Sequence, residues 1–421
     1  MWRFPPIAAI IKVTMPLVTL VLPRTSYKGA DFVAAADELG VDLVVATDGA
    51  PGIVSGRLRR VVPIDCADPA GAAEAIVADA RRAPVDAVVG VDDSGAVIAA
   101  MAAERLGLPH NAPESVTAAT DKAIMRGRMA AAGVAQPAFR VVESAEDARR
   151  AAGEIGFPVV VKPVSLSASR GVIRADDGVA LAAAFDRIAA ILDEAGVGGP
   201  LLVEEYMDGD EVAVEALATS EGLEILAVFD KPDPLHGPYF EETIYVTPSR
   251  HPVEVLDGVE RVVRDAVAAL GLAHGPAHAE VRLTPEGPRL IEVAARSIGG
   301  LCGRSLRFGM LGQSLESLLL RAALGMPRRG MRRHTQSSGV MMLPITADGI
   351  LRGVRRTEAV AEVEGITGLE ITVPVGRRLR PLPEGDRYLG FLFAAAERPH
   401  EVESALREAH GLLEIVIEPS P

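Results

Sequence analysis

Short apolar runs alternate with amphipathic, alanine-rich segments over the first hundred residues of the chain. Apolar runs of this kind predict strands buried on both faces, and the segments between them have the residue spacing of helices. This order is typical of parallel β–α–β units, and no glycine-rich dinucleotide motif follows the first run. The predicted strands are 17–22, 42–46, 60–64 and 85–91, and the predicted helices are 30–39, 69–82 and 94–106. Gly90–Asp93 follows a predicted strand, at the place where open α/β sheets usually contact ligands.

The pattern changes further along the chain. We predict a helix over 120–132, with Thr120 as its N-cap, Asp121 in its first turn and Gly133 as its terminator. From Pro158 onward, alternating apolar positions and turn residues indicate an antiparallel sheet, and after about Ser338 a last α+β unit follows. The long helices predicted between these strands are 179–195 and 253–270. The last unit is predicted to hold strands in 339–345, 369–375 and 388–397 and helices over 357–363 and 400–410.

Composition and charge narrow the function classes. Forty-three Lys and Arg against fifty-seven Asp and Glu give a formal charge of −14, which disfavours nucleic-acid binding. The two cysteines provide neither a disulfide framework nor a zinc motif, so we expect a cytoplasmic protein. No apolar run is long enough to span a membrane. The N-terminal apolar patches are interrupted by Lys12 and by prolines, and we expect residues 1–14 to be an extension before a natural start at Met15.

Two glutamates, Glu280 and Glu292, are the most informative residues. They lie in a predicted hairpin with Glu286 at the centre of its loop, and counting outward places the two carboxylates directly opposite each other. Opposed residues have Cβ atoms about 4.5–5.5 Å apart, so two carboxylates repel unless a cation lies between them. We expect Val281, Leu283, Ile291 and Val293 to form the apolar opposite face. Opposed oxygen ligands suit Mg²⁺ shared with phosphates, while two solvated acids remain the other interpretation of this spacing.

Lys162 ends an apolar strand and is followed by a small, hydroxyl-rich loop, residues 165–172. Loops of this composition can wrap phosphate oxygens with backbone N–H groups and hydroxyls, although an edge lysine beside a flexible turn would look the same. A third segment, residues 201–212, is an apolar strand that reaches Glu204–Met207 and then turns at Asp208–Gly209. Such a strand can offer its backbone to a nucleotide base, or it can be an ordinary strand and turn with surface acids.

Taken together, these fragments resemble the ATP-grasp superfamily over nearly the whole chain. The resemblance implies an ATP site with Mg²⁺, or Mn²⁺ as an alternative, held by Glu280 and Glu292. One departure is Ala294, where many members carry an asparagine that ligates metal. The other residues implied to bind the nucleotide are Lys122, Lys162, Ser167, Ser169 and Gly171 for the phosphates, Glu204, Glu205, Tyr206 and Met207 for adenine, and Glu211 for the ribose.

Within the superfamily, the segments around EVAARSIGG and the C-terminal region resemble L-amino-acid ligases. This resemblance implies that Glu242 meets the ammonium group of the first substrate and that Gly299 and Gly300 enlarge the acyl pocket for bulkier acids. Arg296 is implied to act on an acyl phosphate, together with Lys162. We also expect Arg304, and as a second candidate Arg307, to bind a substrate carboxylate, because arginine binds carboxylates bidentately. We expect Cys302 and most of the histidines to be structural, although His274 or His278 could line the site.

The implied reaction is the ATP-dependent joining of a carboxylate and an amine. The resemblance implies that both substrates are amino acids. A carboxylate attacks the γ-phosphoryl group, and an amine then displaces phosphate from the acyl phosphate. Negative charge accumulates in both steps, so preorganised cations are the expected catalysts. Two alternatives stay open: a biotin-carboxylase-like or purine-pathway enzyme that activates bicarbonate or formate, and an ATP-binding regulator without activity. Many members pair as dimers, which leaves a homodimer open as well.

The predicted architecture has three parts. Residues 15–115 are expected to form a Rossmann-like α/β domain, and residues 116–335 an ATP-grasp core with an antiparallel sheet and a lid at about 120–200. Residues 336–421 are expected to form a small α+β unit. The fold class is therefore α/β combined with α+β. A prior of about one domain per 150 residues also suggests two or three domains.

Overall fold

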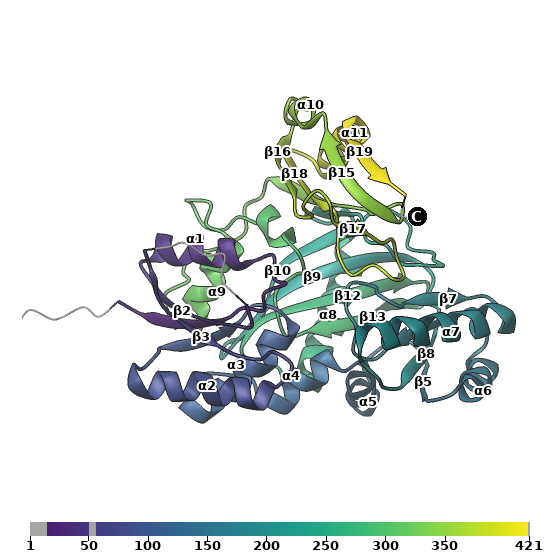
Figure 1. Ribbon diagram of the computed structural model, residues 1–421, viewed down its shortest axis with the longest axis horizontal. Coiled ribbons are helices and arrows are strands. Elements are labelled where there is room, and N and C mark those ends of the chain that lie inside the picture. Colours follow the sequence, from purple (N-terminus) through teal and green to yellow (C-terminus); the bar gives the residue numbers. More distant parts are fainter. Residues whose placement is uncertain (1–14, 50–55, 420–421) are drawn as a thin grey trace, which may run out of the picture.

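The computed structural model describes residues 15–49 and 56–419 (Figure 1). The predicted N-terminal extension, residues 1–14, lies outside this range. The described N-terminal residues form the predicted parallel sheet, in the order β3-β2-β1-β4, and a helix follows each of β1, β3 and β4. The strands are β1 (Leu17–Val21), β2 (Asp42–Thr47), β3 (Leu58–Pro63) and β4 (Ala87–Gly90), and the helices are α1 (Gly29–Leu39), α2 (Pro69–Arg82) and α3 (Asp93–Leu106).

The helix predicted over 120–132 is a single helix that begins two residues later, at Lys122. Thr120 ends α4 (Pro113–Thr120), so the prediction that it is an N-cap is wrong. The cap of α5 (Lys122–Ala132) is Asp121, whose carboxylate accepts hydrogen bonds from the backbone N–H groups of Ala123 and Ile124. A carboxylate reaches those two N–H groups and also favours the positive end of the helix, which explains why Asp121 is the cap. Gly133 ends the helix in the left-handed conformation, as predicted.

The predicted antiparallel strands are divided between two sheets. A four-stranded sheet has the order β5-β8-β6-β7 and, with helices α6 and α7, forms the lid; an eight-stranded sheet has the order β13-β12-β9-β10-β11-β14-β18-β16. The chain passes from the lid to the large sheet between Glu205 and Asp210. The lid elements are β5 (Phe139–Val142), α6 (Ala145–Ile155), β6 (Val159–Pro163), β7 (Ile173–Ala175), α7 (Gly178–Ala195) and β8 (Leu201–Glu205). The large sheet takes β9 (Asp210–Thr219), β10 (Gly222–Lys231), β11 (Ile244–Thr247), β12 (Gly275–Thr284) and β13 (Gly287–Ala294) from the middle of the chain, with α8 (Val253–Leu270) against it.

The C-terminal region extends the large sheet. Three of its strands, β14 (Ser337–Leu343), β16 (Ile366–Ile371) and β18 (Gly390–Ala396), join that sheet through β11. The remaining strands form a small sheet of order β17-β15-β19. The other elements are the short 3-10 helix η1 (Cys302–Ser305), α9 (Leu315–Ala323), β15 (Gly349–Arg355), α10 (Thr357–Ala361), β17 (Arg378–Leu379), α11 (Pro399–Leu412) and β19 (Glu414–Glu418).

The hairpin of β12 and β13 pairs Glu280 with Glu292, as predicted, but by a different register. The turn holds Pro285 and Glu286, so Arg282 faces Arg289 and Val281 faces Leu290. A bulge at Ile291 then shifts the register by one residue, which brings the two glutamates opposite each other. Ile291 was predicted to lie on the apolar face; instead it lines a cavity, and Leu290 is buried beside Val281.

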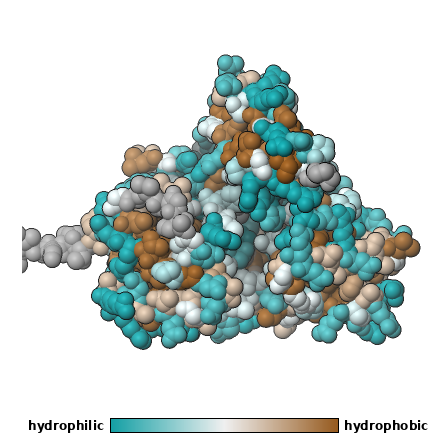
Figure 2. Space-filling view, in the orientation of Figure 1, coloured by the Kyte–Doolittle hydropathy of each residue, from teal (hydrophilic) through white to brown (hydrophobic). Residues whose placement is uncertain are grey.

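The three parts surround the middle of the large sheet (Figure 1). One apolar core joins the N-terminal sheet to the large sheet, since Leu20 and Phe32 pack in the same cluster as Phe229 and Phe391. Separate cores lie under α8, within the lid and around α11. Figure 2 shows a hollow in this face of the molecule between the three parts. Among the described residues, no helix is both long enough and apolar enough to cross a membrane.

Candidate active site

One large cavity, with a volume of about 1450 Å³, lies where the N-terminal sheet, the lid, the large sheet and the C-terminal region meet. The structure brings most of the predicted site residues to its wall. These are Lys122, Lys162, Ser167, Ser169, Glu204, Glu205, Tyr206, Met207, Glu211, Glu242, Glu280, Glu292, Arg296, Gly299 and Gly300. Gly171 and Arg304 are not among the lining residues.

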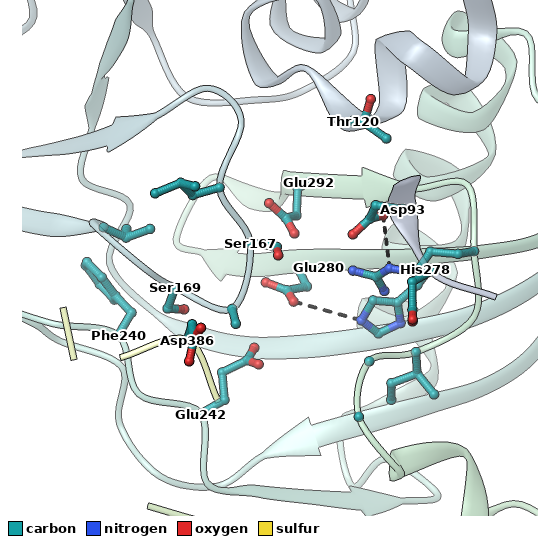
Figure 3. A pocket seen from close by; sticks show the side chains of 18 of the residues that line it. Asp93, Thr120, Ser167, Ser169, Phe240, Glu242, His278, Glu280, Glu292 and Asp386 are labelled. Atoms are coloured by element: carbon teal, nitrogen blue, oxygen red, sulfur yellow. Dashed lines mark hydrogen bonds and ion pairs between the residues drawn. The ribbon is translucent and has the colours of Figure 1, made fainter. Parts of the chain in front are cut away.

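The two opposed acids lie on one wall of the cavity (Figure 3). Burial raises the pKa of Glu280 well above its usual range, and Lys231 offsets this only in part. Burial acts in the same direction on Glu292, but Lys122, Lys162 and Arg296 outweigh it and hold the pKa of Glu292 at about 2. Lys122 Nζ lies 3.5 Å from Glu292 Oε2. A divalent cation near Glu280 would relieve the cost of burying that carboxylate.

Lys231, at the end of β10, lies among three carboxylates. Its Nζ donates to Glu211 and Glu242 and lies 3.5 Å from Glu280 Oε2. Among the described residues, oxygens of these three glutamates lie within 4.8 Å of one another, the spacing of a cation site. Burial lowers the pKa of Lys231, but the three carboxylates outweigh burial and raise it above its usual range. The ammonium group is therefore the resident cation of this cluster.

Lys162 on β6 and Glu204 on β8 form a buried ion pair on the lid sheet. Lys162 Nζ lies 2.7 Å from Glu204 Oε2, and Arg126 Nε donates to Glu204 Oε1 at 2.7 Å. Burial would raise the pKa of Glu204, but Arg126 and Lys162 hold it at about 2. Burial lowers the pKa of Lys162. The Glu204 side chain therefore holds Lys162 in place, and only the backbone of this strand is left to meet a base.

The other residues implied to bind adenine also have different roles: some hold the fold together and others face the cavity. Glu205 accepts two hydrogen bonds from Arg289, at 2.8 and 2.7 Å, which ties the lid to β13. The guanidinium carbon of Arg174 lies over the Tyr206 ring, 4.1 Å from the ring centroid. Met207 is buried at the cavity wall. Glu211, predicted to meet a ribose, is held by Lys231 and by Arg282, whose Nη2 is 2.8 Å away.

The loop predicted to wrap phosphates has an unusual backbone. Ala168 and Ser169 both have positive φ, 55° and 54°, a conformation that non-glycine residues rarely adopt twice in succession. Such strain gathers at ligand-binding segments. Lys122 Nζ donates to the carbonyl of Leu166 at 2.8 Å, which places this ammonium between the loop and Glu292. Gly171 has a φ of 72°, packs on Pro163 and ends the loop.

Arg296 is oriented by the N-terminal sheet. Its Nε donates to Asp93 Oδ1 at 3.0 Å, and its Nη1 donates to the carbonyl of Ser297 at 3.1 Å. Burial lowers the pKa of Arg296, but Asp93 and Glu292 outweigh burial and raise it. Lys28 supports the same loop, because its buried Nζ donates to the carbonyl of Ser297 at 3.0 Å. Asp93 is the last residue of the Gly90–Asp93 segment that was predicted to contact a ligand, and both Asp92 and Asp93 line the cavity.

His278 lies two residues before Glu280, and it lines the cavity whereas His274 is not among the lining residues. Its Nδ1 lies 3.2 Å from Glu215 Oε2, and its Nε2 lies 3.9 Å from Glu280 Oε1. Burial lowers the pKa of His278 well below its usual range, with Arg296 and Lys231 acting in the same direction. The imidazole is therefore neutral at physiological pH.

Glu242 faces the same cavity from the segment before β11. Tyr245 Oη donates to Glu242 Oε1 at 2.7 Å, and Tyr388 Oη lies 3.4 Å from Oε2. Burial would raise the pKa of Glu242, but Lys231 and Tyr245 lower it, so this carboxylate is ionised. An ionised, partly buried carboxylate beside two phenols can receive an ammonium group.

Two of the predicted substrate residues have structural partners instead. Arg304 Nε donates to both oxygens of Asp31, at 3.0 and 2.9 Å, and its Nη1 binds Glu370, so it joins α1 to β16 away from the cavity. Arg307 donates to backbone carbonyls beside Arg304. A Cβ at Gly300, whose φ is 55°, would lie 2.6 Å from the Phe391 ring, whereas a Cβ at Gly299 would meet nothing within 4 Å. Only Gly299 therefore has the open space that the prediction of an enlarged pocket requires.

Sequence reasoning missed several residues that shape the cavity. Lys231 carries the same signal as Lys162, because each lysine ends an apolar strand and precedes a proline. Tyr245 and Tyr388 lacked a local signal, since their position depends on how β11 and β18 join the large sheet. Arg126 and Glu215 had none either, because each is a charged residue in an otherwise apolar neighbourhood and finds its partner far along the chain.

Comparison with known proteins agrees with this geometry. Three family models match: an ATP-grasp domain over residues 155–305, an ATP-grasp N-terminal domain over 33–110, and an L-amino acid ligase C-terminal domain 2 over 341–418. The chain therefore carries ATP-grasp domains, followed by an L-amino acid ligase C-terminal domain. This ATP-grasp chain is 26% identical over 423 residues to protein y4rH of Sinorhizobium fredii, covering 92% of this chain and 85% of that protein.

Two further comparisons concern ligases. Alanine–anticapsin ligase of Bacillus subtilis is 30% identical over 245 residues, which covers 54% of this ATP-grasp chain and 51% of that enzyme. The chain thus spans about half the length of this relative. The crystal structure of an L-amino acid ligase from Bacillus licheniformis superposes with a TM-score of 0.80 at 24% identity, over 96% of this chain and 99% of that one. The comparisons confirm the predicted ATP-grasp domains and the predicted fold.

Proposed function

We propose that this chain is an ATP- and Mg²⁺-dependent carboxylate–amine ligase that joins two amino acids through an acyl phosphate. The observation that carries the proposal is the opposed pair Glu280 and Glu292, on the same cavity wall as Lys122, Lys162 and Arg296. Two acids provide ligands for a divalent ion, and three cations surround the place where phosphoryl charge develops. The match of the C-terminal region to an L-amino acid ligase domain favours amino acids over bicarbonate or formate as the activated acid.

The donor set fits a divalent cation. Glu280 and Glu292 would hold it, since both carboxylates face the cavity and burial makes the Glu280 charge costly without a cation. When bound, Mg²⁺ supplies charge neutralisation for phosphate oxygens. Mn²⁺ is an alternative with similar ligand preferences. Ala294 offers no ligand atom on this wall.

The protein's own cations would hold the phosphates and the acyl group. Lys162 is fixed by Glu204, and Lys122 lies between the loop carbonyl of Leu166 and Glu292, so both ammonium groups are preorganised. Arg296 is fixed through Nε and Nη1, which leaves Nη2 as the edge of the guanidinium that is available to an acyl phosphate. Preorganised donors of this kind stabilise developing charge without reorganisation during the reaction.

The acid substrate would place its ammonium group against Glu242. This carboxylate is ionised, and Tyr245 holds one of its oxygens in place. The names of two relatives agree with amino-acid substrates, because one is an alanine–anticapsin ligase and another is a D-alanine–D-alanine ligase of Delftia acidovorans.

Substrate-dependent phosphate release tests this function. The purified protein is mixed with ATP, Mg²⁺ and pairs of amino acids, and phosphate and ADP are measured together with the mass of any dipeptide formed. We expect release that requires an acid and an amine together. Release that is stimulated by bicarbonate or formate and by no amino acid would instead establish the alternative acid. Tight ATP binding without ADP formation under all of these conditions would point to a regulator.

The acidic pair is tested in the same assay by changing Glu280 or Glu292 to Gln. Each change removes one negative charge from the proposed metal site, and we expect turnover to fall at least about 100-fold, the scale of losing one electrostatic catalyst. Glu286→Gln, in the exposed turn of the same hairpin, is the matched control and should keep turnover within about twofold. Full activity of the Glu280 and Glu292 variants would contradict the assignment of metal ligands.

A further inference from the structure

His278 shares the cavity-facing side of the hairpin with the acidic pair. Residues two apart on a strand point to the same face, so His278 and Glu280 lie on one side of β12. Glu292 and Ala294 are their direct partners on β13. Three of these four neighbouring positions thus carry ligand-type side chains, and the fourth carries only a methyl group, which leaves room beside the imidazole ring.

The distance between His278 and Glu280 suits two ligands of one ion. Nε2 of His278 lies 3.9 Å from Oε1 of Glu280 (Figure 3). Metal–nitrogen and metal–oxygen bonds to small divalent ions are each about 2.0–2.2 Å, so two ligands of one ion can be up to about 4.4 Å apart. An ion placed between these two atoms would reach both without movement of the backbone.

Glu215 orients the imidazole ring from the opposite side. Its carboxylate is fully buried in β9, and Oε2 lies 3.2 Å from Nδ1 of His278 and accepts the N–H of Ile298 at 2.9 Å. Burial raises the pKa of Glu215 to about 8, but Oε2 already accepts the N–H of Ile298 and therefore serves as the acceptor toward Nδ1 as well. A proton on Nδ1 leaves the lone pair of the imidazole ring on Nε2. The lone pair then points toward Glu280 and the cavity. A carboxylate, a histidine and a metal arranged in this order are a recurrent second layer of support at metal sites.

We propose that His278 is a nitrogen ligand of the divalent ion held by Glu280 and Glu292, and that Glu215 is its positioning residue. This inference rests on the proposed metal site and adds a nitrogen donor to its oxygen ligands. Imidazole favours Mn²⁺ and Co²⁺ over Mg²⁺, because affinity at nitrogen ligands rises along the first transition row. The site therefore binds Mn²⁺ and Co²⁺ more tightly than an all-oxygen site would.

Pulsed electron paramagnetic resonance on the full chain with Mn²⁺ and ADP tests the ligand directly. A coordinated imidazole nitrogen gives ¹⁴N modulation of the Mn²⁺ signal, and we expect this modulation in the unaltered protein. His278→Asn should abolish it while leaving Mn²⁺ bound through the two acids. His274→Asn, an exposed histidine just before the same strand, is the matched control and should leave the modulation unchanged. Absence of ¹⁴N modulation in the unaltered protein, or its persistence in His278→Asn, would overturn the proposal.

Affinity measurements by calorimetry provide a second readout. We expect His278→Asn to weaken Mn²⁺ binding about 10- to 100-fold and Mg²⁺ binding much less, since supporting and nitrogen ligands at metal sites contribute on this scale. Glu215→Gln should also weaken Mn²⁺ binding, because a Gln amide that donates to Nδ1 forces the proton onto Nε2. Equal losses for both ions in His278→Asn would indicate a purely structural histidine and would contradict the proposal.

These outcomes are separate from those of the proposed ligase. Both measurements report metal binding and need no turnover. If no amino-acid pair releases phosphate but the ¹⁴N signal depends on His278, the ligase proposal fails and the ligand assignment holds. If amide formation is observed and the signal is absent, the reverse is true.

Discussion

At the scale of single residues, the carboxylate of Glu204 holds two cations of the site at once. Lys162 and Arg126 contact its two oxygens, and all three side chains are at most 5% exposed. The pKa of Glu204 is held at about 2, below the ordinary value of 4.5, so its charge contributes to stability. A shift of this size corresponds to about 3 kcal/mol in the free energy of unfolding. Glu204 thus supports both the fold and the placement of Lys162.

Glu204→Gln should lower the stability at neutral pH, because it leaves two buried cations without their anion. The pKa is lower in the folded state, so the stabilisation is complete above about pH 4.5 and is lost as the pH falls toward 2. The difference in melting temperature between the unaltered protein and the variant should therefore shrink over this window. Glu143→Gln, on an exposed lid residue, provides the baseline. A difference that stays constant from pH 7 to pH 3 would show that the ion pair carries no such energy.

Gly299 and Gly300 should respond differently to the same substitution. Gly300→Ala puts a Cβ 2.6 Å from the Phe391 ring at a φ of 55°, so we expect a loss of about 1–3 kcal/mol in the free energy of unfolding. Gly299→Ala has open space and should keep the melting temperature while it reduces turnover with bulky acids more than with small ones. Thermal denaturation and a panel of acid substrates check both expectations. Equal destabilisation by the two changes would refute the assigned difference.

Single residues also show what the sequence could and could not predict. Lys162, Glu280 and Glu292 were predicted because each follows a local pattern of strand or turn, whereas Lys122 was implied by the family resemblance; all four line the cavity. Arg304 does not line the cavity as predicted, because it is paired with a carboxylate on α1 that is far away in sequence. A pattern locates a charged side chain on an element, but its partner depends on which elements pack together.

At the scale of elements, the bulge in the β12–β13 hairpin does more than set the pairing register of the two strands. The carbonyl of Ile291, the extra residue, accepts a hydrogen bond from Arg126 Nη2 at 2.7 Å. The hairpin thereby supports the Arg126–Glu204–Lys162 group as well as the acidic pair. The predicted three-residue loop and the observed two-residue turn with a bulge give the same opposition of Glu280 and Glu292. Counting residues therefore found the pair but could not locate the extra residue.

Deleting Ile291 should separate these two effects. The strands on either side of the bulge then pair in regular register, so Glu280 still faces Glu292. The carbonyl bound by Arg126 is lost, which should cost about 1.5–3 kcal/mol, the contribution of a hydrogen bond to a charged group. We expect Mn²⁺ affinity to stay within about threefold while the melting temperature falls and the KM for ATP rises. Ile291→Val keeps the bulge and is the control; loss of Mn²⁺ binding by a folded deletion variant would argue against this register.

At the scale of the whole molecule, residues 380–388 of the C-terminal region join the lid to the substrate side of the cavity. Arg187 on lid helix α7 binds both oxygens of Glu384, and Arg380 binds Glu194 at the end of the same helix. The N–H of Gly171 donates to the carbonyl of Pro383 at 3.0 Å. The same segment ends at Tyr388, which faces Glu242. No sequence pattern predicted this connection, because it depends on the relative placement of three parts that are distant along the chain.

The connection predicts that the lid and the acid pocket open together. Glu384→Gln removes one partner of a partly exposed, bidentate ion pair, worth up to about 1 kcal/mol, so kcat/KM for ATP should fall by at most about fivefold. Hydrogen exchange should become faster in residues 380–388 and 165–171 together, because Gly171 is bonded to this segment. Exchanging the charges in Arg187→Glu with Glu384→Arg should restore much of the protection. Arg352→Gln breaks an exposed pair with Glu418 on the small sheet and should change neither region. Faster exchange confined to residues 380–388 would mean that the phosphate loop closes independently of the C-terminal region.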